Sequence, residues 1–256
     1  MVLLVVPTTL VVLALLSLFL LTPHPPKAPA DCASPEALRT YFGTLADHET
    51  PPALEATVSR DGRTVFAEAF GSIDSRRSVP NSTDAVYHYW SVTKLFTATA
   101  IMQLTEDGKL RLDEPVTKYL PGFVTSYRHR LAPITIRQLL SHSSGMQDLK
   151  PGDLVGWIHH LQDPPMRQPT LIEKRMSTYR RLVAAPGTRS AYSNAGYIVL
   201  SAIIERASGH SYEEFVRARI LRPLGMTSTD FGIAGTCSHA RFPEPTLCST
   251  YSLRCW

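Results

Sequence analysis

The strongest constraint on the fold of this chain is a change in the spacing of its apolar residues at Ser91. Before this point, residues 53–59 and 64–70 are short β-rich runs separated by an Asp-Gly pair, which is a typical hairpin signal. From Ser91 to Asp107 the apolar residues recur every three or four positions, which predicts a helix: Val92, Leu95, Phe96, Ala98, Ile101, Met102 and Leu104. We therefore expect an α/β (α+β) fold in which an antiparallel hairpin precedes a helical lobe.

Other segments favour a mostly helical second half. Gly108 and Gly209 are natural helix ends, and Ser211-x-x-Glu214 is a capping box that begins a helix reaching Leu221. The remaining predicted helices are Pro35–Leu45, a short one after Asp113 with Pro115 near its first turn, Thr135–Leu140 and Ala195–Ser208. The polar segment before Ser91 contains the glycosylation sequon Asn81-Ser82-Thr83, which matters only in a eukaryotic host.

The N-terminus carries an almost unbroken apolar run without charge, Val2 to Leu21. Its length and the lack of a preceding Lys or Arg favour a retained membrane anchor, whereas Ala28-Pro29-Ala30 offers the small residues of a signal-peptidase site. Residues 1–22 are therefore predicted to be a signal peptide or an anchor, with a buried core helix as a less favoured alternative. Residues 23–34 form a Pro-rich spacer. We expect the globular part outside the cytoplasm, either secreted or membrane-anchored.

Composition excludes several classes of function. The chain is 44% hydrophobic and 19% charged, which suits a packed core rather than disorder. Its net charge of +4 is small and no Lys/Arg run is present, so nucleic acid is not expected as a partner. The four cysteines have neither CxxC nor zinc-ligand spacing: Cys32, Cys237, Cys248 and Cys255. They could form disulfides in an exported chain, with the pairing left open.

The first candidate for chemistry is Ser91-Val92-Thr93-Lys94. If Ser91 begins a helix, Lys94 lies one turn further on the same face, so the two side chains can touch. A serine hydroxyl needs a base, and both burial and the helix N-terminus would favour the neutral amine of Lys94. The Ser91 backbone N–H could donate to an oxyanion. The alternative is accident, because a chain of this length carries on the order of one Ser-x-x-Lys by chance.

The second candidate is Tyr192-Ser193-Asn194, which precedes a predicted helix. Tyr192 can transfer a proton between a nucleophile and a leaving group, and Asn194 can bond a substrate carbonyl or hold a lysine. The alternative is a turn in which Asn194 caps the helix. The adjacent pair His159-His160 has no partner at metal-ligand spacing and no HExxH is present, so we expect neither a metal nor another cofactor.

Together these motifs resemble the serine β-lactamase-related and penicillin-binding-protein-like family, which includes class C β-lactamases, D-Ala-D-Ala carboxypeptidases and esterases. The resemblance covers about residues 53–231, and further stretches carry it: Val65–Gly71, 104–110, 113–116, 139–145 and 223–226. It implies that Ser91 is acylated, Lys94 activates it, Tyr192 completes the proton relay and Asn194 places the substrate. His142 lies in a stretch that is structural in the family, so we interpret it as a turn or core histidine.

One family motif is missing from the printed sequence. The resemblance implies a late Lys-Thr-Gly or His-x-Gly on a strand beside the nucleophile, and residues 232–256 contain neither. We therefore expect a β-lactamase/transpeptidase-like domain at 35–231 whose antiparallel sheet lacks its C-terminal strands. Residues 232–256 form an atypical Cys-containing tail with no clear strand. We hypothesise that this tail is a frameshifted, misspliced or truncated end. Sequencing the transcript or gene beyond this point tests the hypothesis, and the same end in frame with a genuine stop would contradict it.

The functional prediction follows from these features. The chain is expected to be a serine hydrolase that cleaves an ester, a β-lactam or a peptide-like amide, with a small-molecule or peptide-like substrate as its partner. The alternatives are a truncated, non-catalytic fragment or pseudo-enzyme of the same family, and an anchored binding module. The possible tether is residues 2–21, and the oligomeric state is left open.

Overall fold

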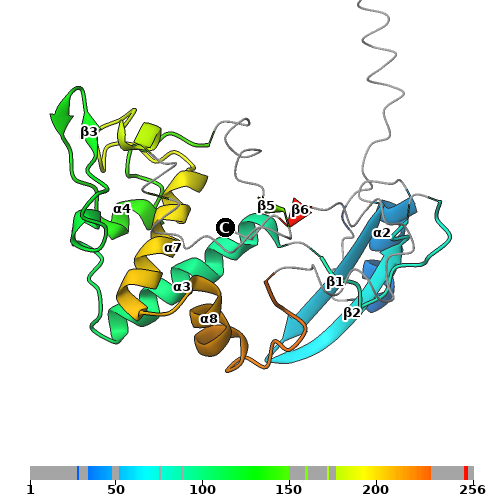
Figure 1. Ribbon diagram of the computed structural model, residues 1–256. Helices are drawn as coiled ribbons and strands as arrows, with labels where there is room; N and C mark the ends of the chain where they lie inside the picture. The colour runs from blue at the N-terminus through cyan, green and yellow to red at the C-terminus, as the bar shows by residue number, and fades with distance from the viewer. Residues whose placement is uncertain are drawn as a thin grey trace, which may run out of the picture. The chain divides into compact units, whose positions relative to one another are not determined.

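The computed structural model describes residues 28, 34–47, 52–74, 76–87, 89–149, 159–160, 172, 177–231 and 251–252. They fall into two compact units (Figure 1). Of the described residues, those up to Tyr87 belong to the first unit and those from Tyr89 onward to the second.

The first unit is a hairpin covered by one helix. Strands β1 (Ala53–Arg60) and β2 (Arg63–Gly71) pair antiparallel, with α2 (Pro35–Asp47) alongside them (Figure 1). The two turn residues Asp61 and Gly62 have φ of 51° and 72°, the left-handed backbone that a tight hairpin turn requires. The predicted hairpin is confirmed, with one extra feature, a bulge in the register between Val58 and Ser59.

Aromatic rings join the helix to the hairpin. The ring of Phe42 on α2 lies 6.2 Å from that of Phe66 and 6.0 Å from that of Phe70, both on β2. An isolated two-stranded hairpin is only marginally stable in water, so this covering helix supplies the apolar burial that the two strands lack.

The sequon asparagine has a structural role at the end of the hairpin. Asn81 Nδ2 donates to the carbonyl oxygens of Leu54 at 2.9 Å and Phe70 at 3.2 Å, and to the hydroxyl of Tyr87 at 2.7 Å. This nitrogen is the atom to which an N-linked glycan would attach. In the folded unit it is instead engaged with both strands.

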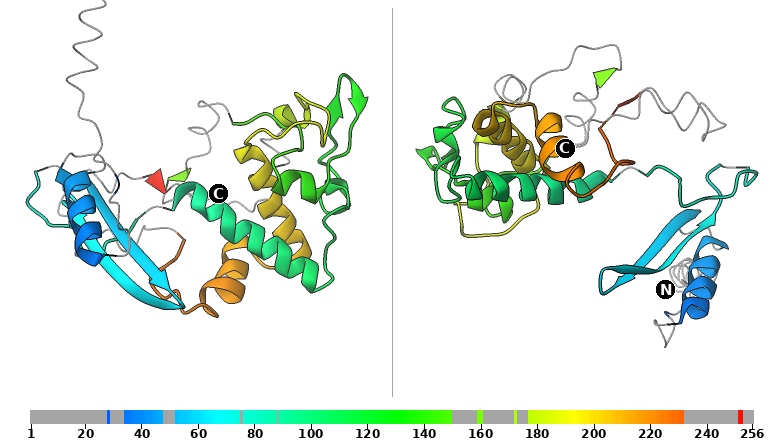
Figure 2. Two further views of the ribbon diagram at one scale, coloured as in Figure 1. Left: turned by 180° about the vertical axis from the view of Figure 1, so that it is seen from behind. Right: turned by 90° about the horizontal axis from the view of Figure 1, so that it is seen from below.

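The second unit is built around a largely apolar helix, α7 (Asn194–Ser208). Its residues from Ala195 to Glu205 are all buried, so the helix is enclosed on every side. Three helices pack against it: α3 (Thr93–Glu106), α4 (Ile136–Leu140) and α8 (Tyr212–Val216) (Figure 2). Helix α8 continues as a π-helical segment, Arg217–Leu221. This arrangement places the N-terminal end of α7 beside α3.

The helix ends follow the predicted signals. Ser193 caps α7 by accepting a hydrogen bond from Gly196 N at 3.1 Å, and Gly209 ends it with φ of 79°. The capping box that begins α8 is present between Ser211 and Glu214. Two predictions are corrected: α3 begins at Thr93, after a 3₁₀ turn (Trp90–Val92), and the segment after Asp113 is a 3₁₀ turn (Val116–Lys118) rather than an α-helix.

The apolar stripe predicted for α3 divides between two faces. Ile101 and Leu104 are fully buried, whereas Val92, Leu95 and Met102 are exposed. The buried face instead includes polar side chains, Thr97 and Lys94 among them. Periodicity alone did not distinguish these faces, because the apolar residues of α3 are spread around the helix and are not confined to one side.

Three two-stranded antiparallel ladders make up the sheets that the structure describes. Besides β1–β2, they are β3 (Ser126–Tyr127) with β4 (Arg130–Leu131), and β5 (His159–His160) with β6 (Tyr251–Ser252). The last pair corrects the expectation of a tail without strands. Within the described ranges no larger sheet occurs, which agrees with the expected incomplete sheet.

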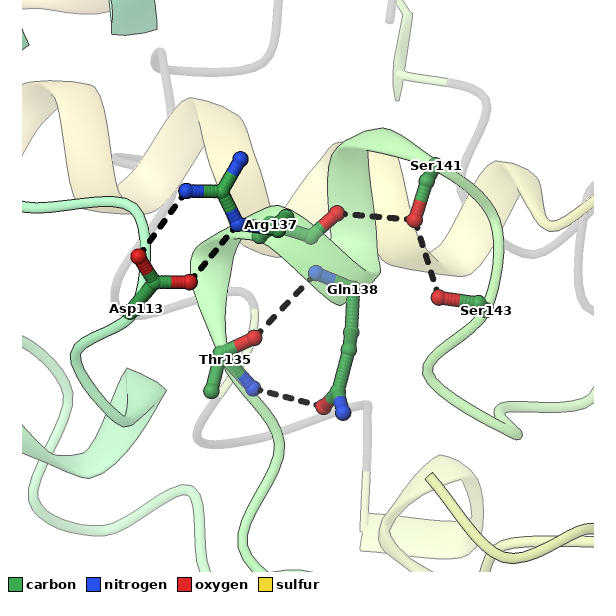
Figure 3. Close-up of polar contacts among 6 residues, drawn as sticks. All are labelled: Asp113, Thr135, Arg137, Gln138, Ser141 and Ser143. Atoms are coloured by element: carbon green, nitrogen blue, oxygen red, sulfur yellow. Dashed lines mark hydrogen bonds and ion pairs between the residues drawn. The ribbon is translucent and has the colours of Figure 1, made fainter. Parts of the chain in front are cut away.

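Helix α4 directs the chain into the loop that later contributes to the site. Thr135 and Gln138 form a reciprocal capping box, with bonds of 3.2 and 3.0 Å (Figure 3). Arg137 forms a two-pronged ion pair with Asp113, at 2.6 and 2.8 Å. After the helix, Ser141 Oγ donates to the Arg137 carbonyl at 2.9 Å, so the following loop leaves α4 in a defined direction.

The predicted N-terminal and cysteine features lie outside the described residues. This applies to the apolar run 2–21, to most of the spacer 23–34, and to all four cysteines. Among the helices that the structure does describe, none is long and apolar enough to cross a membrane.

Candidate active site

The Ser91 and Lys94 side chains meet at the start of α3, as their spacing predicts. Ser91 lies in the 3₁₀ turn and is exposed, and Lys94 is the second residue of the α-helix, with only 9% of its surface exposed. Lys94 Nζ donates to Ser91 Oγ at 3.2 Å. The contact is a local consequence of helical geometry, which places residues three apart on one face.

Tyr192 reaches the same oxygen from a distant part of the chain. Its hydroxyl donates to Ser91 Oγ at 2.7 Å, from the loop that leads into α7. Half of the Tyr192 surface is exposed. Ser91 Oγ therefore contacts two groups capable of exchanging a proton, an amine and a phenol.

Asn194 faces the amine from the first turn of α7. Its side-chain Oδ1 accepts a hydrogen bond from Lys94 Nζ at 2.8 Å. The alternative interpretation of Asn194 as a helix cap is corrected, because Ser193 is the capping residue. Lys94 Nζ also lies 4.8 Å from the centroid of the Tyr192 ring and 5.6 Å from that of Tyr197, an arrangement that stabilises a cation.

A carboxylate that the sequence did not single out completes this group. Asp148 Oδ1 accepts from the backbone N–H of Asn194 at 2.7 Å, and its Oδ2 accepts from Asn194 Nδ2 at 3.2 Å. Asp148 follows the predicted Ser141–Gly145 stretch, but no spacing rule connects it with Asn194, which lies 46 residues later. Only the approach of two loops reveals the pair.

His142 lies beneath the tyrosine. Its ring centroid is 4.7 Å from that of Tyr192 and 5.0 Å from that of Tyr197. Its Nδ1 accepts a hydrogen bond from Ser193 N at 3.2 Å, which requires the neutral imidazole with the proton on Nε2. Burial holds the pKa of the His142 imidazole below its ordinary value, Lys94 lowers it further, and Asp148 opposes the shift. His142 also adopts φ of 56°, so it turns the chain after α4.

Backbone bonds hold the two loops together. Ala191 N donates to the His142 carbonyl and Gly187 N to that of Ser143, both at 2.8 Å. The backbone of Gly145 lies directly against that of Ala184. Its φ is 79°, and a β-carbon at this position would lie 2.1 Å from the carbonyl oxygen of Ala184. The loop from Ser141 to Asp148 thus depends on a residue without a side chain.

No metal centre accompanies these groups in the part of the chain that the structure describes. There, no cluster of three His, Cys, Asp or Glu side chains could hold an ion. The pair His159-His160 belongs to strand β5, which is described by its backbone pairing alone.

Comparison with known proteins identifies the family. Residues 38–236 match the beta-lactamase family. The chain belongs to this family. Penicillin-binding protein 4* of Bacillus subtilis (strain 168) is a relative with 32% identity over 197 residues, covering 75% of this chain and 40% of the relative. The D-alanyl-D-alanine-carboxypeptidase/endopeptidase AmpH of Escherichia coli (strain K12) is 32% identical over 178 residues, covering 69% of this chain and 44% of the relative.

A solved structure extends the likeness to the fold. The octameric penicillin-binding protein homologue from Pyrococcus abyssi has a TM-score of 0.62 at 34% identity, covering 75% of this chain and 43% of that one. The predicted resemblance and the β-lactamase/transpeptidase-like α/β (α+β) fold are thereby confirmed. Membership of the beta-lactamase family also makes the chain a relative of serine hydrolases. The chain spans less than half the length of these relatives.

Proposed function

We propose that this beta-lactamase-family chain is a serine hydrolase that forms an acyl-enzyme on Ser91. One observation carries the proposal: Ser91 Oγ lies within hydrogen-bond distance of both Lys94 Nζ, at 3.2 Å, and Tyr192 OH, at 2.7 Å. A nucleophile with a base and a second proton carrier at one oxygen is the arrangement that acyl transfer requires.

In the proposed acylation step, Lys94 reacts as the neutral amine. Ser91 Oγ forms a bond to the substrate carbonyl carbon while its proton passes to Lys94 Nζ. The ammonium that forms is stabilised by Asn194 Oδ1 and by the face of the Tyr192 ring. Tyr192 gives its hydroxyl proton to the leaving group, and the additional proton on Lys94 restores the phenol. The Ser91 backbone N–H is the proposed donor to the oxyanion.

The same groups can complete the turnover. A water molecule replaces the leaving group, loses a proton to the Lys94–Tyr192 pair and attacks the acyl carbon, and Ser91 Oγ departs with that proton. Ser91 and Tyr192 are both exposed, so a substrate can reach them.

The proposed substrates are small-molecule or peptide-like acyl compounds: an ester, a β-lactam or a peptide-like amide. The names of two relatives, a penicillin-binding protein and a D-alanyl-D-alanine carboxypeptidase/endopeptidase, support this chemical class. We also propose that the globular part acts outside the cytoplasm, because the uncharged run Val2–Leu21 suits a signal peptide or an anchor.

A second candidate is a non-catalytic member of the family. The printed sequence lacks the Lys-Thr-Gly or His-x-Gly motif on which the family's second oxyanion donor depends. Losing one such donor costs roughly 10²–10³ in rate. If no other segment supplies this donor, a site built on Ser91 and Lys94 would bind acyl compounds and turn them over slowly or not at all.

A fluorophosphonate probe separates the two candidates. The probe forms a covalent bond to an activated serine, so the native protein should be labelled on the peptide that contains Ser91, as read by mass spectrometry. Ser91→Ala should abolish labelling, whereas Ser59→Ala, at an exposed position on strand β1, should retain it. Absence of labelling in the folded native protein, or equal labelling of Ser91→Ala, would favour the non-catalytic candidate.

A further inference from the structure

We infer that Asp148 is a positioning residue for this site: its carboxylate sets the orientation of the Asn194 amide and so decides which Asn194 atom faces Lys94. The inference rests on the proposed function of Ser91 and names a residue that neither sequence motif contains. Asp148 contacts no reacting atom, so it acts through Asn194.

The carboxylate holds Asn194 at two points. One oxygen accepts from the backbone N–H of Asn194 at 2.7 Å and the other from its side-chain Nδ2 at 3.2 Å. An ionised carboxylate can only accept hydrogen bonds, so the amide nitrogen of Asn194 must face it. The amide oxygen is then left to face Lys94 Nζ, which it contacts at 2.8 Å.

Packing alone would not select this orientation. The oxygen and nitrogen of an asparagine amide have nearly the same size, and a rotation of half a turn exchanges them with little change in shape. The exchange would, however, turn two N–H donors toward the lysine. Lysine nitrogen also donates, so the flipped amide would lose the 2.8 Å bond and would repel the ammonium.

Lys94 Nζ has few polar partners among the described residues. Ser91 Oγ and Asn194 Oδ1 accept from Nζ, while Tyr192 and Tyr197 present ring faces. His142 contacts both of those rings, but an imidazole carries no negative charge and cannot serve as a counter-charge to the ammonium. Asp148 is the carboxylate linked to Lys94 through Asn194, so it both orients the amide and supplies negative charge to the chain of hydrogen bonds.

Asp148→Asn tests the orientation with almost no change in shape. The introduced amide offers one acceptor and one donor group where the native carboxylate offers two acceptors. The oxygen of the introduced amide can still accept a hydrogen bond from the backbone N–H of Asn194. Its NH₂ group then faces the Asn194 side chain and favours the flipped amide, because a donor needs the amide oxygen as its partner. We expect the second-order rate constant for fluorophosphonate labelling of Ser91 to fall about tenfold or more, since misplacement of a catalytic group costs this much. Asp113→Asn removes an equal charge from the surface pair with Arg137 and should leave the rate unchanged.

A double-variant cycle shows whether the effect passes through Asn194. Asn194→Ala should reduce the rate at least as much as Asp148→Asn, and the double variant should react at the rate of Asn194→Ala alone. Fully multiplicative effects would overturn the inference, as would a rate for Asp148→Asn equal to that of the native protein.

Nuclear magnetic resonance tests the same inference without activity. The chain contains only two asparagines, Asn81 and Asn194, so ¹⁵N-asparagine labelling should give two side-chain NH₂ pairs. The Asn194 pair should shift in Asp148→Ala and stay in place in Asp113→Ala. If the native protein is not labelled by the probe but this shift is observed, the proposed function fails while the positioning contact stands. An unshifted pair overturns the inference itself.

Discussion

The hydroxyl of Tyr192 donates to Ser91 Oγ at 2.7 Å, although the two residues are 101 positions apart in the chain. Lys94 approaches the same oxygen from the helix that follows Ser91, at 3.2 Å. The local contact needs only a helical turn, whereas the distant one needs α7 to pack beside α3. The proposed proton relay thus depends on the packing of the second unit.

Tyr192→Phe tests the relay while keeping the ring. The phenol oxygen is lost, but the contacts of the ring with Lys94 and His142 remain possible. We expect the hydrolysis rate of a chromogenic ester to fall about 10²-fold or more, the usual contribution of a proton-transfer group. The unfolding midpoint should change little. Tyr197→Phe is the matched control. This variant should lose about 1 kcal/mol of stability, because the hydrogen bond from the hydroxyl to the Leu140 carbonyl is lost, and it should retain the hydrolysis rate. Native activity in Tyr192→Phe would exclude Tyr192 from the relay.

His142 should make the second unit sensitive to acid. Burial and the charge of Lys94 lower the pKa of the folded imidazole below its ordinary value of 6.5, despite the opposing charge of Asp148. The unfolded chain therefore binds the proton at a higher pH than the folded one. This contribution to stability is fully present above about pH 6.5 and is lost as the pH falls through the lower folded pKa.

The measurement is the urea midpoint at pH 8 and at pH 5. His142→Asn keeps a side-chain acceptor near the position of Nδ1 and tolerates the left-handed backbone, but it does not titrate. We expect the native protein to lose more stability between the two pH values than His142→Asn does. Equal losses would show that protonation of His142 is not coupled to folding.

Gly145→Ala should disrupt the loop that carries Asp148. The added carbon would lie 2.1 Å from the Ala184 carbonyl oxygen, and φ of 79° is unfavourable for alanine. We expect a loss of about 2 kcal/mol or more in the free energy of unfolding, measured in urea. Gly122→Ala is the control, because the new carbon meets nothing within 4 Å there and the backbone needs no left-handed φ. Similar midpoints for the two variants would contradict the clash.

Asn81→Asp should weaken the first unit. The substitution replaces a donor with a carboxylate that faces the carbonyl oxygens of Leu54 and Phe70. We expect a loss of about 2 kcal/mol from the unsatisfied acceptors. Thr83→Ala removes the sequon from an exposed position without touching the amide, and it should be nearly neutral. Equal stability of the two variants would mean that the Asn81 amide does not hold the hairpin.

Local rules predicted several parts of this chain well. The Asp61-Gly62 turn, the end of α7 at Gly209 and the capping box at Ser211 each depend on neighbouring residues alone. The same rules did not predict which side of α3 is buried, because its apolar residues Leu95 and Met102 are exposed. When apolar residues occur on more than one side of a helix, their spacing does not reveal which side packs against a neighbour.

By itself, the sequence predicted that the Ser91 and Lys94 side chains meet, because residues three apart on one helix share a face. The motif Tyr192-Ser193-Asn194 was also recognisable, but not the distances that join it to Ser91. Only the tertiary structure decided that Asp148 contacts Asn194 and that the ring of His142 lies against that of Tyr192. These contacts join segments far apart in the chain, so they follow from how α4 and α7 pack and not from any local spacing.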